Sequence, residues 1–92
     1  MDNTQSDDRR FVYFYFNRTE LEKIRQAVPD HVQYWKTANP QGYIGGPFAD
    51  RTGGLISFVA SNLEDATKLI LRDPFILEDL IAEKWIKEWI PE

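Results

Sequence analysis

The sequence has no cysteine and only one histidine, and both facts limit its chemistry. Without cysteine there are no disulfide bonds, no thiolate nucleophile and no cysteine-ligated metal. One histidine alone is also a poor basis for a metal site, so we expect neither a metal nor a cofactor. His31 is therefore the only side chain of a type that commonly exchanges protons near neutral pH.

Basic residues and long apolar runs are also scarce. Lys and Arg number 11 against 15 Asp and Glu, which gives a net charge of −4. Nucleic-acid binding usually needs a basic face, so we expect no nucleic-acid partner. No apolar run is long enough to span a membrane, and no signal peptide is recognisable. The default expectation is a soluble cytoplasmic protein with no membrane partner.

What the chain does contain is enough for one small domain. It has 92 residues, of which 42% are hydrophobic and 14% aromatic. The start of the chain is polar and acidic and offers little apolar surface to bury. We therefore expect a disordered tail over residues 1–9 and a single domain over residues 10–92.

The first half of the chain predicts a strand and then a helix. Residues 11–16 are six consecutive aromatic or β-branched residues, which favours a strand with both faces largely covered. A capping box at Thr19–Glu22 predicts the start of a helix, in which apolar residues recur every three or four positions. Pro29 should kink or split this helix, and the Asn-Pro-Gln-Gly segment at 39–42 should end it.

The second half begins with two strands and another helix. Residues 43–48 predict a short strand whose Gly45-Gly46-Pro47 centre is distorted. Residues 55–60 predict a third strand, and a second capping box follows directly at Ser61–Glu64. The helix that starts there should stop at Asp73-Pro74.

The last segment, residues 80–90, fits a helix and a strand almost equally well by periodicity. The order of strand, capping box and helix at 11–38 recurs at 55–72, however, and each copy needs a following strand. This regularity predicts an α+β domain with the ferredoxin-like βαββαβ order, and it makes the last segment a strand. Both helices would cover one sheet face and leave the other apolar, which predicts a homodimer packed through the sheets.

Several short motifs together resemble the YCII (YciI-like) family over roughly residues 11 to 90. They are His31-Val32-Gln33-Tyr34, Gly45-Gly46-Pro47-Phe48, Gly53-Gly54-Leu55, Asp73-Pro74-Phe75, and the pair Trp85 and Trp89. The resemblance implies a ferredoxin-like fold that pairs into a dimeric α+β barrel. It also implies that the last segment is a strand. The chain departs from the pattern in its acidic start and in the break at Asn39-Pro40.

The resemblance further implies an active site made of a helix histidine and the aspartate of the Asp-Pro-Phe motif. By position these are His31 and Asp73. Members of the family largely lack assigned substrates, and their folds resemble muconolactone-isomerase-type enzymes, which implies isomerase or lyase chemistry. Tyr34 and Gly45-Gly46-Pro47 are the candidate substrate-binding residues. The glycines would form a wall without side chains, where a ligand can approach backbone amides.

The chemistry of such a pair is simple. A histidine accepts a proton when a carboxylate holds its other ring nitrogen and stabilises the imidazolium. Without the resemblance, His31 is better explained as a helix-boundary residue with no role, and Asp73 as a helix stop or a salt-bridge partner of Arg72. Three functions therefore stay open: an acid/base enzyme acting on a small organic molecule, a non-catalytic ligand-binding or regulatory dimer, and a structural accessory protein whose pocket is filled by side chains.

Overall fold

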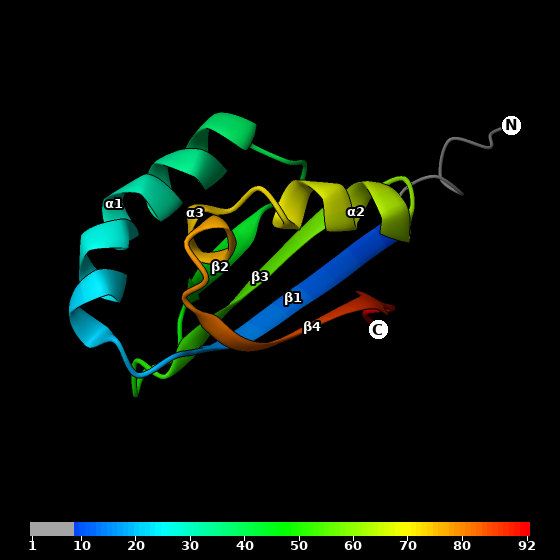
Figure 1. Cartoon of the computed structure of the whole chain (residues 1–92). Helices are drawn as coiled ribbons and strands as arrows, with labels where there is room; N and C mark the ends of the chain where they lie inside the picture. The colour runs from blue at the N-terminus through cyan, green and yellow to red at the C-terminus, as the bar shows by residue number, and fades with distance from the viewer. Residues whose placement is uncertain (1–8) are drawn as a thin grey trace, which may run out of the picture.

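A four-stranded antiparallel sheet with three helices on one side makes up the fold (Figure 1). The computed structural model describes residues 9–92. The elements, in chain order, are β1 Arg9–Asn17, α1 Leu21–Ala38, β2 Ile44–Pro47, β3 Gly53–Ala60, α2 Leu63–Ile70, α3 Pro74–Leu77 and β4 Ile81–Trp89. The strand order in the sheet is β2-β3-β1-β4. The predicted α+β class is confirmed, and the order agrees with a ferredoxin-like sheet.

The central strand β1 is apolar on both faces. Its odd-numbered residues from Phe11 to Tyr15 are at most 4% exposed, whereas its even-numbered residues from Val12 to Phe16 are half-buried on the opposite face. The prediction that both faces are largely covered therefore holds fully for one face only. The core lies between the first face and the helices and consists of Phe11, Tyr13, Tyr15, Ile24, Ala27, Trp35, Ile56, Phe58, Ala66, Ile70, Phe75 and Leu80.

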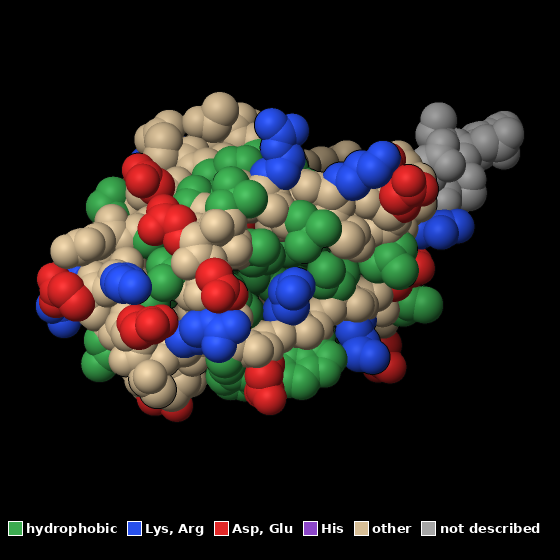
Figure 2. Space-filling view, in the orientation of Figure 1, with side chains coloured by type: hydrophobic (Ala, Val, Ile, Leu, Met, Phe, Trp, Pro, Cys, Tyr) green, Lys and Arg blue, Asp and Glu red, His purple; other side chains and the backbone are tan. Residues whose placement is uncertain are grey.

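The side of the sheet away from the helices has no covering element among residues 9–92 (Figure 1). In Figure 2, apolar side chains show along the lower side of the molecule, mixed with acidic and basic ones. The pairing of two such sheets into a barrel remains a prediction.

Both helices begin differently from the prediction. The prediction of a capping box at Thr19–Glu22 is wrong, because Glu20 is the N-cap of α1 and its side chain makes no capping hydrogen bond. Glu22 pairs with Arg25 instead, at 3.0 Å. For α2 the cap is Asn62 rather than Ser61, and its side chain accepts a hydrogen bond from the Asp65 amide at 2.7 Å. Asn caps a helix as well as Ser does, so the start moves by one residue.

Helix α1 is not split at Pro29. It runs from Leu21 to Ala38, and Figure 1 draws it as one continuous, curved ribbon. Pro29 lies on the exposed face, where water can satisfy the carbonyl that loses its helical partner. The helix ends at Asn39, as predicted, with the left-handed φ of 44° that is common after a helix.

The two ends of the described chain and one short helix can also be compared with the prediction from sequence. The final segment is a strand, β4, as the βαββαβ order predicted. The helix α3 was not predicted. Of the expected tail over residues 1–9, only Arg9 is described and it opens β1; the rest lies outside the described residues. No helix within residues 9–92 combines the length and apolarity needed to cross a membrane.

Candidate functional site

Asp73 is a fully buried carboxylate, with 0% of its surface exposed. It lies between α2 and α3, and its side chain caps α3 by accepting a hydrogen bond from the Phe75 amide at 2.8 Å. The indole Nε1–H of Trp35 donates to its other oxygen, also at 2.8 Å. These two groups can only donate, so both carboxylate oxygens act as acceptors, which suits the ionised form.

His31 is the third partner of this carboxylate. Its Nδ1 lies 2.9 Å from Oδ1 and 2.9 Å from Oδ2 of Asp73. His31 and Trp35 are four residues apart on α1, so they share one helix face and reach the same carboxylate. The imidazole also stacks on the Phe75 ring, with 4.1 Å between centroids and 7° between planes. The predicted pair is thus in direct contact, on a rigid support.

These contacts define which ring nitrogen of His31 is available to accept a proton. An ionised Asp73 accepts the Nδ1–H, which leaves Nε2 as the unprotonated nitrogen of the neutral ring. No described residue forms a hydrogen bond with Nε2. The His31 side chain is 13% exposed and lines a cavity. A molecule bound in the cavity can therefore meet a ring nitrogen that is able to accept a proton.

The cavity has a volume of about 490 Å³, which is ample for a small organic molecule. Gly45, Gly46 and Pro47 of β2 form part of its wall, as expected. A Cβ at Gly45 would lie 2.5 Å from the Tyr43 hydroxyl oxygen, so glycine allows that ring to pack against β2. A Cβ at Gly46 would meet nothing within 4 Å. The wall is therefore smooth, and the cavity is not filled by side chains.

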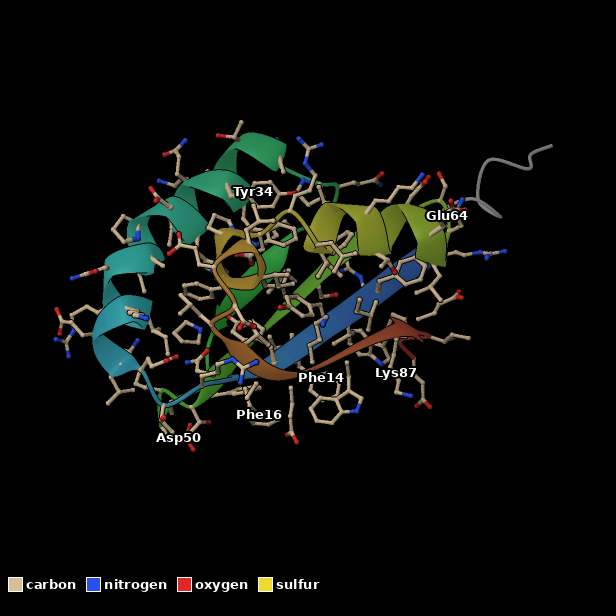
Figure 3. The ribbon with its side chains drawn as sticks, in the orientation of Figure 1. Phe14, Phe16, Tyr34, Asp50, Glu64 and Lys87 are labelled. Atoms are coloured by element: carbon tan, nitrogen blue, oxygen red, sulfur yellow. The ribbon has the colours of Figure 1, made fainter. Side chains whose placement is uncertain are left out.

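Tyr34 does not line this cavity, although it was a candidate for substrate binding. Figure 3 shows it between α1 and α2, where its hydroxyl donates a hydrogen bond of 2.6 Å to the Leu69 carbonyl. Burial raises the pKa of this hydroxyl. Tyr34 therefore joins two helices. It became a candidate through the His31-Val32-Gln33-Tyr34 motif, but its hydroxyl reaches α2 and its ring does not line the cavity.

Several residues of the site were missed. Trp35 is one of the apolar residues that recur along the first helix, and its i, i+4 spacing from His31 places both on one helix face. Phe75 belongs both to the core and to the cavity wall. Tyr15, Tyr43 and Arg51 come from other elements, and only the tertiary fold brings them to the cavity. Within residues 9–92, no three His, Cys, Asp or Glu side chains are grouped to hold a metal ion.

Two buried tyrosines next to the site should make the protein less stable at alkaline pH. Burial, and secondarily the negative charge of Asp73, raise the pKa of Tyr13 and Tyr15. The phenols thus stay protonated in the folded state after those of the unfolded chain have begun to ionise, near pH 10. The contribution of these two phenols to the free energy of unfolding should be constant below that pH and fall as pH rises above it.

Urea unfolding at a series of alkaline pH values measures this effect. Tyr13 has a buried hydroxyl without a hydrogen-bond partner among the described residues, so Tyr13→Phe should unfold with a shallower dependence on pH. Exposed Tyr43 is the control: Tyr43→Phe should change the slope less, because it is 37% exposed. A free energy of unfolding that does not fall above about pH 10 would contradict the prediction.

The comparisons with known proteins agree with this fold. Among solved structures the chain is similar to the 5-chloro-2-hydroxyhydroquinone dehydrochlorinase (TftG) from Burkholderia phenoliruptrix AC1100, in complex with 2,5-dihydroxybenzoquinone. The TM-score is 0.76 and the sequence identity 20%, over 88% of this chain and 93% of that one. At this identity the likeness supports the fold alone.

The comparisons at the level of sequence identify the family. No curated protein matches the chain significantly. The YCII-related domain, in contrast, matches residues 10–90. That match spans nearly all of the described residues, including α1 with His31 and the Asp73-Pro74-Phe75 motif. The chain therefore belongs to the YCII-related domain family.

Proposed function

We propose that this protein is a small acid/base enzyme of the isomerase or lyase type, which acts on a small organic molecule through His31 and Asp73. One observation carries the proposal. A fully buried carboxylate binds one nitrogen of the only histidine, whose ring lines a cavity of about 490 Å³. Such a pair is costly to bury, and it leaves one nitrogen that can accept a proton from a bound molecule.

The proposed reaction begins with the transfer of a proton from a C–H or O–H group of the ligand to His31. His31 Nε2 takes a proton from the substrate, and the carboxylate of Asp73 stabilises the resulting imidazolium through Nδ1–H. In an isomerisation, the same nitrogen returns the proton to another carbon. In an elimination, a leaving group departs with its bonding electrons and the imidazolium later loses the proton to water. Neither route needs a metal or a cofactor.

The walls of the cavity suit a flat, cyclic substrate. The stacked rings of His31 and Phe75 form one aromatic surface. Trp35 and Tyr43, stacked with 5.7 Å between centroids, form another. The structural neighbour is named for the dehydrochlorination of a hydroxylated hydroquinone. This supports a hydroxylated or carbonyl-bearing ring as the substrate class and elimination as one reaction type.

The test uses two assays on the full chain. Chloride release is measured with 5-chloro-2-hydroxyhydroquinone, and exchange of ring-adjacent hydrogens for deuterium is followed by NMR with cyclic ketones in D₂O. Catalysis in either assay that disappears in His31→Ala supports the proposal. Saturable binding of 2,5-dihydroxybenzoquinone without any turnover would contradict it and favour the ligand-binding alternative.

We also propose that a second copy of this chain covers the open sheet face. Figure 3 shows Phe14, Phe16 and Lys87 on the side of the sheet away from the helices. Phe14 stacks on Trp85 with 5.2 Å between centroids, and Trp85 is still 39% exposed. Glu83 and Lys87 flank Trp85 on the same face, so a two-fold-related copy can pair opposite charges around an apolar centre.

The substitution Trp85→Glu tests this interface. It places a charge in the centre of the proposed contact, so the dissociation constant should rise at least about 100-fold. Light scattering and sedimentation at micromolar concentration measure the change. Leu77→Glu is the matched control, because Leu77 is an apolar residue of α3 with 70% exposure away from the sheet. A wild-type protein that is monomeric at micromolar concentration would contradict the dimer.

A further inference from the structure

The charged side chains that line the cavity are all positive. Lys36 of α1 and Arg51 of the β2–β3 turn contribute to its lining, and no Asp or Glu of the described residues does so. Asp73 lies behind His31, fully buried. The whole chain, in contrast, has a net charge of −4. The sign of the cavity is thus opposite to that of the protein, which points to a ligand with negative charge.

Neither of these two cations forms an ion pair within the described part of the chain. The ion pairs among residues 9–92 involve Arg18, Arg25, His31 and Lys68, but neither Lys36 nor Arg51. Both side chains are exposed at the rim of the cavity. Exposed cations that pair with no carboxylate of residues 9–92 remain available to an anion that enters.

The backbone at Arg51 gives a second, independent observation. Its φ of 65° lies in the left-handed region, which favours glycine. The turn is held around it: Asp50 Oδ1 accepts hydrogen bonds from the Thr52 amide at 3.0 Å and from its hydroxyl at 2.7 Å. The Arg51 amide donates to the Phe48 carbonyl at 2.9 Å. Such a conformation in a non-glycine residue is more common at functional sites, where it fixes the direction of a side chain.

We propose that the substrate is a ring-bearing organic anion, whose carboxylate or ionised enol group is held by Lys36 and Arg51. This inference rests on the proposed function of the cavity. The ring lies against the aromatic walls and the anionic group points to the rim. When His31 removes a proton, negative charge builds up on the substrate, and the two cations stabilise it. Arg51 can bind a carboxylate with two parallel hydrogen bonds, and Lys36 adds a point charge.

The test compares an anion with its neutral analogue. Benzoate and benzamide are similar in shape, and their affinities for the full chain can be measured by NMR titration. Benzoate should bind at least about tenfold more tightly, and its affinity should fall as salt is added. Lys36→Met and Arg51→Gly should each weaken benzoate binding by roughly five- to tenfold and leave benzamide binding unchanged. Lys23→Met, on the same helix but outside the cavity lining, should change neither.

Arg51→Gly carries a second readout. Glycine adopts the left-handed conformation without strain, so this variant should have a higher unfolding temperature although it binds the anion less well. A loss of affinity that comes with a lower unfolding temperature would contradict the argument from the backbone.

Three results would overturn the proposal: equal affinity for benzoate and benzamide, unchanged benzoate affinity in both variants, or no benzoate binding at millimolar concentration. Because the titration needs no turnover, it is independent of the test of catalysis. If the protein binds benzoate through Lys36 and Arg51 but turns nothing over, only the proposed catalytic function is contradicted. If both variants keep full enzymatic activity, only the proposed anionic substrate is contradicted.

Discussion

Replacing His31 with Ala should reduce kcat by about a thousandfold, the size of effect that a general base commonly contributes. The fold should survive. Asp73 keeps its hydrogen bonds from Trp35 and Phe75 in this variant, and the lost ring lines the cavity and is not part of the core cluster. Kinetics with the substrate found in the assays above, together with circular dichroism and light scattering, measure both parts of the prediction.

Two further measurements separate a lost base from a damaged cavity. Val32→Ala removes a neighbouring side chain that also lines the cavity but cannot carry a proton, so it should change KM more than kcat. Free imidazole added to His31→Ala should restore part of the activity, because the space left by the ring can admit it. Full activity in His31→Ala would end the proposal of a His–Asp enzyme.

Replacing Asp73 with Ala should lower the free energy of unfolding by about 3–5 kcal/mol, which is the largest loss of stability we expect for a polar residue of this chain. The Trp35 Nε1–H and the Phe75 amide would both lose their acceptor in the interior. The α3 N-cap would be lost as well. Urea unfolding followed by tryptophan fluorescence measures the loss, and one below about 1 kcal/mol would contradict this account.

The conservative variant Asp73→Asn separates stability from chemistry. An amide oxygen can still accept one of the two hydrogen bonds, so the loss of stability should be smaller than in Asp73→Ala. The amide NH₂, however, would donate to Nδ1 of His31 and leave the proton on Nε2. A ring in that tautomer cannot accept a proton from the substrate, so kcat should fall at least about 100-fold. Asp73→Asn with full turnover would show that the carboxylate does not control the tautomer.

Much of the architecture follows from the order of patterns in the sequence rather than from any one pattern. Residues 80–90 fit a helix and a strand almost equally well by periodicity, and the strand follows from the repeated strand–helix order and from the family resemblance. The two helix starts were misplaced because Thr19, Ser61 and Asn62 all suit an N-cap, and packing chooses among such neighbours. The α3 helix was missed, although Asp followed by Pro is also a signal for a helix start.

The site could be predicted only in part. His31 and Asp73 came from the family pattern, and their contact is a result of tertiary packing. Trp35 could have been found from its spacing, because i and i+4 lie on one helix face. Tyr34 lies three residues from His31 in the same motif, yet its hydroxyl bonds to α2, so closeness in the sequence did not bring it to the cavity. Arg51 reaches the cavity through a turn conformation that residue type does not predict.

The contacts of Asp73 also bear on the stage of folding at which the candidate site forms. One carboxylate begins α3 and joins it to His31 and Trp35 on α1, across 42 and 38 positions of the chain. Forming contacts between such distant segments costs loop-closure entropy before the contact repays it. A chain in which α1 and α3 are not yet packed together therefore holds no oriented imidazole. Turnover in refolding experiments should rise only once these two helices have packed.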